Sequence, residues 1–299
     1  MSQPRPSSAL SPHGATRVEL DGPHGPVAAL QGPRPGDTVG SALLVPGYTG
    51  SKEDFAPLLD GIAAAGILPV AVDLPGQFES PGPHDESAYR PAELGKVVAD
   101  LATSFAADGP VVLLGHSYGG LVARGAVLAG APVAGLTLLC SGPAALPPGP
   151  RRRALDAGEV LLRQGGVGAA YAVRQQLTAA LGDGSVDRAP DALSEFLRTR
   201  FVATSAACLL GMAHGLRHEP DLVDDLAAAL RAGATPGLVV TGAHDDAWSV
   251  PSQQDMARRL GAEFVVVPDA AHSPNTENPA ALLAALLPRW RRWIGRDAG

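Results

Sequence analysis

Short, continuously apolar runs alternate with amphipathic, helix-like segments along most of this chain. The apolar runs predict buried strands, and they are SALLV (41–45), ILPVAV (67–72), VVLL (111–114), VAGLTLLC (133–140), GLVVTG (237–242) and EFVVVP (263–268). Helical patterns lie between or after these runs, at 55–66, 91–105, 120–130, 251–260 and 277–293. Strands this uniformly apolar predict a mostly parallel sheet with helices on both faces. Right-handed crossovers make it a doubly wound α/β sandwich.

Two regions depart from the alternation. Residues 1–14 are polar and rich in proline, which predicts a disordered tail. A hairpin of TRVEL (16–20) and VAAL (27–30) follows it, and we expect residues 15–299 to form a single α/β domain. From about 144 to 220 every segment is helix-like and no strand intervenes. This stretch predicts a helical cap, inserted after the sixth strand and lying over one edge of the sheet; ordinary core-packing helices are the alternative.

Composition narrows the class of protein. The formal net charge of −7 over 299 residues carries no basic footprint, so we expect no nucleic-acid partner. The two cysteines match neither a disulfide framework nor a zinc-site spacing. The sequence lacks both the apolar core of a signal peptide and an apolar run long enough to span a membrane. We therefore expect a soluble, cytoplasmic protein, and the sequence leaves its oligomeric state open.

The stretch VVLLGHSYGG (111–120) places a serine where a predicted strand meets a predicted helix. Gly115, Ser117 and Gly119 spell G-x-S-x-G, a weak signal by itself in a chain with 36 glycines. The position is more informative, because ligands of open α/β sheets bind at the carboxyl ends of the strands. Flanking glycines allow a turn tight enough to project a hydroxyl group. Ser117 is therefore a candidate nucleophile, which needs a histidine base oriented by a carboxylate.

Later strand ends supply both partners. Asp245 follows the run GLVVTG and His272 follows the run EFVVVP. The order serine, aspartate, histidine is that of the nucleophile-elbow arrangement. Since the carboxyl ends of parallel strands share one edge, we expect Ser117, Asp245 and His272 to meet there. Asp246, next to Asp245, is the alternative acid.

Other histidines and one aspartate near these motifs receive structural interpretations. His116 is expected to point away from the serine and to pack or hydrogen-bond structurally, and His244 and Asp269 to be loop or turn residues. His214 and His218 lie at the far end of the predicted cap. Surface positions are expected for this pair, with contact to substrate as the alternative.

Acyl transfer also requires donors for a developing oxyanion. One predicted donor is the backbone N–H of Tyr118, directly after the candidate nucleophile. The other is expected in the loop PGYTGS (46–51) after the strand 41–45, where Tyr48 is the first choice and Thr49 the second. A plain turn at Pro46-Gly47 is the alternative for this loop.

Taken together, the sequence resembles the α/β-hydrolase superfamily from about residue 16 onward. The stretches that carry the resemblance are LLVPGYTGSKEDF, VAVDLPGQFES, LLGHSYGG, VVTGAHDDAW and DAAHSPNTENP. The resemblance implies Ser117 as nucleophile, His272 as base and Asp245 as acid, with Tyr48 and Tyr118 forming the oxyanion hole. It also implies that the cap lies over the site.

Two loops depart from the family pattern. The first usually reads His-Gly, where this chain has Pro46-Gly47. The second usually reads Asp-x-x-Gly-His-Gly-x-Ser, where this chain has DLPGQFES with Gln77 and Phe78 in place of His and Gly. The first change affects the shape of the oxyanion loop, and the second adds apolar bulk to the pocket rim.

A serine nucleophile suits attack on a carbonyl group, whereas an aspartate at position 117 would have suggested epoxide or carbon–halogen cleavage. The sequence predicts a serine hydrolase that cleaves small, apolar carboxylic esters through an acyl-enzyme, with no metal or organic cofactor. Phe78, Phe201, Leu209 and Met212 are the candidate pocket residues, and packing between helices is the alternative for the last three. Alternatives are cleavage of thioesters or of carbon–carbon bonds with the same triad, cofactor-free cyanohydrin cleavage, and a non-catalytic ligand-binding protein.

Overall fold

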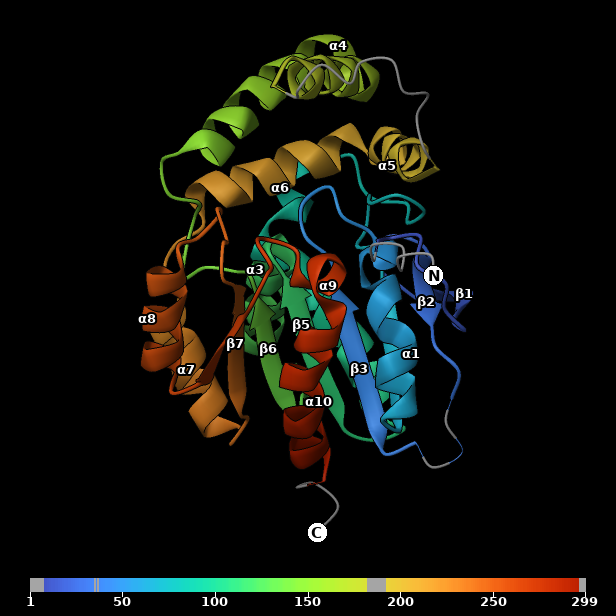
Figure 1. The fold of residues 1–299 in the computed structure, drawn as a ribbon, viewed down its shortest axis with the longest axis vertical. Helices are drawn as coiled ribbons and strands as arrows, with labels where there is room; N and C mark the ends of the chain where they lie inside the picture. The colour runs from blue at the N-terminus through green and yellow to red at the C-terminus, as the bar shows by residue number, and fades with distance from the viewer. Residues whose placement is uncertain (1–7, 35, 37, 182–191, 296–299) are drawn as a thin grey trace, which may run out of the picture.

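An eight-stranded sheet forms the centre of the protein (Figure 1). The computed structural model describes residues 8–34, 36, 38–181 and 192–295. The strands are β1 (Thr16–Leu20), β2 (Val27–Gln31), β3 (Gly40–Val45), β4 (Ile67–Val72), β5 (Val111–His116), β6 (Gly135–Leu139), β7 (Gly237–Gly242) and β8 (Glu263–Val267). Their spatial order is β1-β2-β4-β3-β5-β6-β7-β8. The neighbouring strands in the run β4-β3-β5-β6-β7-β8 are all parallel, while β2 is antiparallel to both β1 and β4. The predicted mostly parallel sheet is confirmed.

Helices cover both faces of this sheet. On one face lie α1 (Ala56–Ala64) and α10 (Pro279–Ile294), which stand in front of the strands in Figure 1. The other face packs against α2 (Pro91–Ala106), α3 (Tyr118–Leu128), α7 (Val223–Ala232) and α8 (Val250–Leu260). Every residue of β3, β4, β5 and β6 is buried, so neither face of these strands is exposed to solvent. This double burial is why the sequence shows apolar runs instead of alternation.

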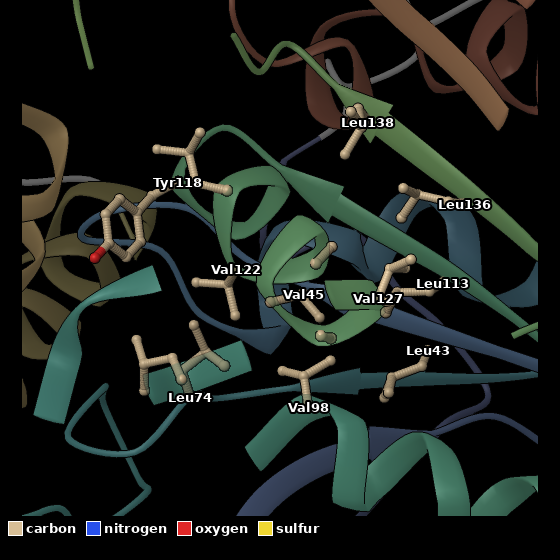
Figure 2. Close-up of a cluster of buried hydrophobic side chains, with 14 of the residues drawn as sticks. Leu43, Val45, Leu74, Val98, Leu113, Tyr118, Val122, Val127, Leu136 and Leu138 are labelled. Carbon is tan, nitrogen blue, oxygen red and sulfur yellow. The ribbon is translucent and has the colours of Figure 1, made fainter. Parts of the chain in front are cut away.

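Apolar side chains from strands and helices interdigitate beneath α2 and α3. Figure 2 shows part of this cluster: strand residues such as Leu43 and Leu113 meet Val98 of α2 and Val122 of α3. The phenol ring of Tyr118 belongs to the same cluster and is fully buried. The helix that follows Ser117 is therefore fixed by its packing on the sheet, which holds the strand-to-helix turn in place.

Three helices lie above the carboxyl ends of the strands, and we call them the cap: α4 (Pro150–Leu181), α5 (Ala192–Ala203) and α6 (Ala206–His218) (Figure 1). They fall between β6 and β7, so the predicted insertion after the sixth strand is confirmed. The backbone of α4 is kinked at Gly166, where φ is 74°. The helical patterns of the sequence analysis do not include α7, although its buried residues Val223, Leu226, Ala227 and Leu230 recur at helical spacing.

Capping residues set the ends of several of these helices. The Ser249 side chain accepts from the N–H of Ser252 at the start of α8, and Gly261 ends that helix in the left-handed conformation. Asn278 caps α10 in the same way. Short helical turns complete the fold at η1 (Lys52–Phe55), η2 (Glu86–Tyr89) and α9 (Pro274–Glu277). The helix predicted at 277–293 corresponds to α10, and α9 directly precedes it.

Residues 1–7 of the predicted tail lie outside the described residues. From residue 8 the chain lies against the domain: Ala9 is buried, and the N–H of Gly14 donates to a carboxylate oxygen of Asp60 at 2.8 Å. Within the described ranges, every helix is too short or too polar to cross a bilayer.

Candidate active site

Ser117 stands on a strained turn between β5 and α3. Its backbone has φ 55° and ψ −119°, a region that non-glycine residues rarely adopt. The two motif glycines allow this turn. A Cβ atom at Gly115 would lie 2.1 Å from the carbonyl oxygen of Gly119, and one at Gly119 would lie 2.3 Å from the carbonyl oxygen of Val45. The predicted tight turn is therefore dictated by the close approach of three backbone segments.

The side chains of Ser117, His272 and Asp245 form one continuous hydrogen-bonded chain. The distance from His272 Nε2 to Ser117 Oγ is 2.9 Å, and that from His272 Nδ1 to Asp245 Oδ1 is 2.8 Å. The three residues follow β5, β8 and β7 respectively, at the same edge of the sheet. The structure brings together the side chains that the sequence placed at this edge.

The Asp245 carboxylate is fully buried and held from several sides. Besides His272, it accepts from the N–H of Ala247 at 2.9 Å and from Gln253 Nε2 at 2.8 Å. Burial raises the pKa of Asp245, but the bonds from His272, Ala247 and Gln253 outweigh this effect, so its pKa lies below the ordinary value. The carboxylate thus stays charged and can orient the imidazole. Gln253 is a contact that the sequence reasoning missed, because only the fold places α8 beside this loop.

Asp246, the alternative acid, faces away from His272. Its carboxylate makes a two-pronged contact with the Arg151 guanidinium of α4, and its side chain is 64% exposed. Asp245, and not Asp246, is therefore the carboxylate that contacts the imidazole.

Contacts on both sides fix the loop that carries His272. His116 Nε2 lies 2.7 Å from the carbonyl oxygen of His272 and donates to it, since a carbonyl can only accept. The Glu277 carboxylate accepts from the N–H groups of Ala271 and Ser273, which flank the histidine. Burial lowers the pKa of His116 to about 4, so this imidazole is neutral at physiological pH. His116 thus has the hydrogen-bonding environment expected for it, whereas Glu277 was not foreseen.

Asp269 and the other histidines take no part in the bonds that join Ser117, His272 and Asp245. Asp269 has a positive φ of 52° in the turn after β8, and the N–H of His244 donates to the carbonyl oxygen of Ala270 in the loop after β7. His214 and His218 lie on α6 with their ring centroids 4.3 Å apart. Burial, followed by the charge interaction with His218, lowers the pKa of His214, whose side chain is exposed.

The loop after β3 lies directly beside the serine. A Cβ atom at Gly47 would be 3.0 Å from Ser117 Cβ and 3.4 Å from its Oγ. The N–H of Gly50 donates to the carbonyl oxygen of Gly47, so Tyr48 and Thr49 form the centre of a turn. On the other side of Ser117, Tyr118 is the first residue of α3, whose N–H has no acceptor within its own helix. The backbone therefore places two peptide units around the hydroxyl.

The four predicted pocket residues separate into three places. Phe201 and Leu209 are buried in an apolar cluster of the cap, against which Tyr48 packs. Met212 lies instead in the main core, with its sulfur 3.9 Å from Gln77 Nε2. Phe78 meets the Phe196 ring of α5 edge-on, with ring centroids 5.8 Å apart. Phe78 therefore contacts the cap, and Met212 packs inside the domain.

One group of potential metal ligands was found among the described residues. Atoms of Cys140, Asp245 and His272 lie within 4.8 Å of one another. Burial, followed by the nearby charge of Asp245, raises the pKa of the Cys140 thiol well above its ordinary range. Metal binding requires the thiolate. The protonated thiol and the existing bond between Asp245 and His272 make this group a poor metal site.

Comparison with known proteins places this chain in a family. The profile of the alpha/beta hydrolase family matches residues 42–286. One curated relative, the 2-succinyl-6-hydroxy-2,4-cyclohexadiene-1-carboxylate synthase of Enterobacter sp. (strain 638), is 44% identical over 62 residues. That match spans 21% of this chain and 22% of the relative, so it covers about a fifth of the enzyme it resembles.

Two solved structures share the fold over nearly the whole chain. The thermophilic esterase from Thermogutta terrifontis has a TM-score of 0.67 and 23% identity, covering 94% of this chain and 99% of its own. The thioesterase domain from the curacin biosynthetic pathway has a TM-score of 0.66 and 17% identity, covering 91% and 99% respectively. With the family profile extending from β3 to α10 and a sheet of this topology, the chain belongs to the alpha/beta hydrolase family.

Proposed function

We propose that this protein is a serine hydrolase that cleaves small, apolar carboxylic esters through an acyl-enzyme. The observation that carries the proposal is the hydrogen-bonded chain from Ser117 through His272 to Asp245. A serine hydroxyl becomes an effective nucleophile when an oriented imidazole can remove its proton. Within the alpha/beta hydrolase family, this arrangement fits acyl transfer.

In the proposed reaction, Ser117 Oγ attacks the carbonyl carbon of the ester and His272 Nε2 takes the hydroxyl proton. Asp245 stabilises the imidazolium that forms and holds its tautomer. The N–H groups of Tyr48 and Tyr118 donate to the oxyanion of the tetrahedral intermediate. The intermediate collapses as His272 protonates the leaving alkoxide. A water molecule, deprotonated by His272, then attacks the acyl-serine ester, and His272 returns this proton to Ser117 Oγ as the carboxylic acid is released.

The cap supports an apolar acyl group as the preferred substrate. The buried cluster of α4, α5 and α6 contains Phe201 and Leu209 and continues to Tyr48 beside the serine. The partly buried side chains at the edge of this cluster, Tyr48, Leu161, Val167 and Tyr171, are those available to a small molecule that enters between the cap and the sheet edge. We therefore expect activity to rise with acyl length to an optimum set by the cap.

A panel of p-nitrophenyl esters with increasing acyl length tests the proposal, with Ser117→Ala as the matched variant. We expect hydrolysis by the parent and covalent labelling of Ser117 by a fluorophosphonate. Both are expected to be lost in Ser117→Ala. Undiminished ester hydrolysis by Ser117→Ala would refute the mechanism, and an inert, unlabelled parent would favour a non-catalytic binding role.

The likeness to a thioesterase domain makes cleavage of thioesters the second candidate. The same three groups would act on the thioester carbonyl, with a thiolate leaving in place of an alkoxide. Comparing kcat/KM for p-nitrophenyl esters and acyl-thioesters of equal acyl length separates the two. A clear preference for the thioesters would transfer the proposal to that substrate class.

A further inference from the structure

Gln77 occupies the position where this chain departs from the family pattern, and its side chain is fully buried. Its Oε1 accepts from the N–H of Leu74 at 3.0 Å, and its Nε2 donates to the carbonyl oxygen of Gly47 at 2.8 Å. Because one contact needs an acceptor and the other a donor, only this orientation of the amide satisfies both. Gln77 thus links the loop after β4 to the loop beside Ser117.

The peptide unit that Gln77 holds is the one that carries the N–H of Tyr48. This bond is trans, as are all those described. In a planar trans peptide the carbonyl oxygen and the N–H point in opposite directions. Fixing the Gly47 oxygen toward Gln77 therefore fixes the Tyr48 N–H on the opposite side. The same Gly47 backbone approaches Ser117 closely, as the Cβ distance of 3.0 Å shows.

Gln77 is itself anchored in a rigid loop. Its N–H donates to the carbonyl oxygen of Leu74 at 2.9 Å, and its own carbonyl accepts from the N–H of Ser80 at 2.8 Å. A Cβ atom at the preceding Gly76, where φ is +75°, would lie 2.7 Å from Tyr89 Oη. The support for the Gly47 carbonyl is therefore set before any substrate binds, which is the condition for electrostatic preorganisation.

The far end of the loop 46–51 is held by Asp73, a charged residue in the loop after β4 that also carries Gln77. The N–H of Lys52 donates to Asp73 Oδ1 at 2.7 Å, and its ammonium group contacts Asp73, Glu53 and Glu79. Burial raises the pKa of Asp73 to about 6, so the charge of this carboxyl group varies with pH. An uncharged carboxamide such as that of Gln77 keeps its donor and acceptor at every pH. The bond from Gln77 to Gly47, beside the serine, therefore does not depend on pH, unlike the contact between Lys52 and Asp73.

We propose that Gln77 is a positioning residue for the oxyanion hole: by holding the carbonyl of Gly47, it aims the N–H of Tyr48 at the developing negative charge. The inference rests on the proposed function, because an oxyanion forms only if Ser117 attacks a carbonyl. Gln77 acts through the peptide unit and does not itself touch the substrate.

Two substitutions test this role. Gln77→Met has a similar volume but removes both polar contacts, and we expect kcat to fall by about 10- to 100-fold, below the 10²–10³ for deleting an oxyanion donor outright. KM is expected to change less than about threefold, because the donor acts mainly in the transition state. The affinity for an alkyl boronic acid, which forms a tetrahedral adduct with the serine, is expected to fall in parallel with kcat.

Gln77→Glu supplies the sharper readout. The introduced carboxyl can still accept from the N–H of Leu74, but it donates to Gly47 only when protonated. We expect near-parent kcat at low pH and a fall as pH rises through the pKa of this carboxyl, a step absent from the parent profile. A purely structural role would not produce this step, and the variant provides a result even if Gln77→Met fails to fold.

Thr137→Val is the control, since it deletes a buried hydrogen bond elsewhere in the fold, the one that Trp290 Nε1 of α10 donates to Thr137 Oγ1 of β6. It is expected to lose stability with kcat unchanged. Ser117→Ala, measured alongside, separates the two claims. If it abolishes hydrolysis while Gln77→Met keeps parent kcat and boronate affinity, or Gln77→Glu shows no new pH step, the inference is overturned and the proposed function stands. If Ser117→Ala stays active, both fall.

Discussion

The sheet domain and the cap differ in the size of their apolar cores. The four central strands are buried along their whole length, and two large apolar clusters lie on the two faces of the sheet. The cap's own cluster contains five buried residues, and much of its surface is polar. It is joined to the domain by α6 side chains buried in the main core, such as Met212 and Leu216, and by ion pairs such as Arg200–Asp54, Arg163–Glu86 and Arg151–Asp246.

This difference separates the proposed chemistry from substrate selection. Ser117, Asp245 and His272 all stand on loops of the sheet domain, and their mutual contacts involve no cap residue. The cap lies above the carboxyl ends of the strands, and we propose that it selects the acyl group. We therefore expect changes in the domain to affect kcat and global stability, and changes in the cap to affect KM and local opening.

The largest expected effect lies at the acid. Asp245→Asn should lower kcat by about 10⁴-fold, since an amide at this position favours the wrong histidine tautomer. Asp246→Asn is the matched control one residue away, and we expect it to change kcat by less than about threefold because it loses only an exposed ion pair. Ester hydrolysis at saturating substrate provides the measurement. A larger loss in Asp246→Asn than in Asp245→Asn would contradict the assignment.

Deleting a buried leucine from each region compares their packing. Leu114 is fully buried in the sheet, so Leu114→Ala should cost about 2–5 kcal/mol of unfolding free energy. Leu162 is buried in the cap cluster, and Leu162→Ala should cost less than half as much, with faster hydrogen exchange confined to the cap. Urea denaturation and hydrogen exchange measure the two. Equal global losses would mean that cap and domain unfold as one unit.

The buried His116 makes stability depend on pH. Its pKa of about 4 lies below the unfolded value near 6.5, so the unfolded chain binds the extra proton first as pH falls. His116 alone is therefore expected to lower stability by about 3 kcal/mol from about pH 6.5 down to about pH 4, and the raised pKa of Asp73, about 6, acts in the opposite direction. His116→Gln should flatten this dependence, whereas His214→Gln, on the exposed face of the cap, should leave it nearly unchanged. The measurement is the urea midpoint of unfolding of the parent and of both variants across this pH range.

The smallest effects are expected at the ion pairs of the cap. Arg163→Gln removes contacts with Glu86 and Glu159 that are largely exposed, and should cost less than about 1 kcal/mol and even less at high salt. Arg200 and Asp54 are only 12% and 18% exposed, so Arg200→Gln should loosen the cap more. Limited proteolysis of the cap at low and high salt ranks the two variants. The opposite ranking would show that burial does not govern these contacts.

The sequence predicted the sheet domain well because its signals are local. Each central strand is one apolar run between turn residues, and its double burial follows from that composition. Asp245 and His272 were placed by the rule that parallel strands end at one edge, which needs no distances. The contacts of Gln253, Glu277 and Gln77 are different, since each joins segments whose proximity depends on how helices and loops pack.

By itself, the sequence determined the α/β architecture, the position of the cap and the edge at which the candidate triad gathers, because hydrophobic periodicity and strand direction are properties of the chain. The tertiary structure alone decided that Asp245 and not Asp246 faces the imidazole, that Met212 packs in the core, and that Gln77 supports the loop beside Ser117. Neighbouring residues in a loop differ only in where their side chains point, and that direction is fixed by packing between segments far apart in the sequence.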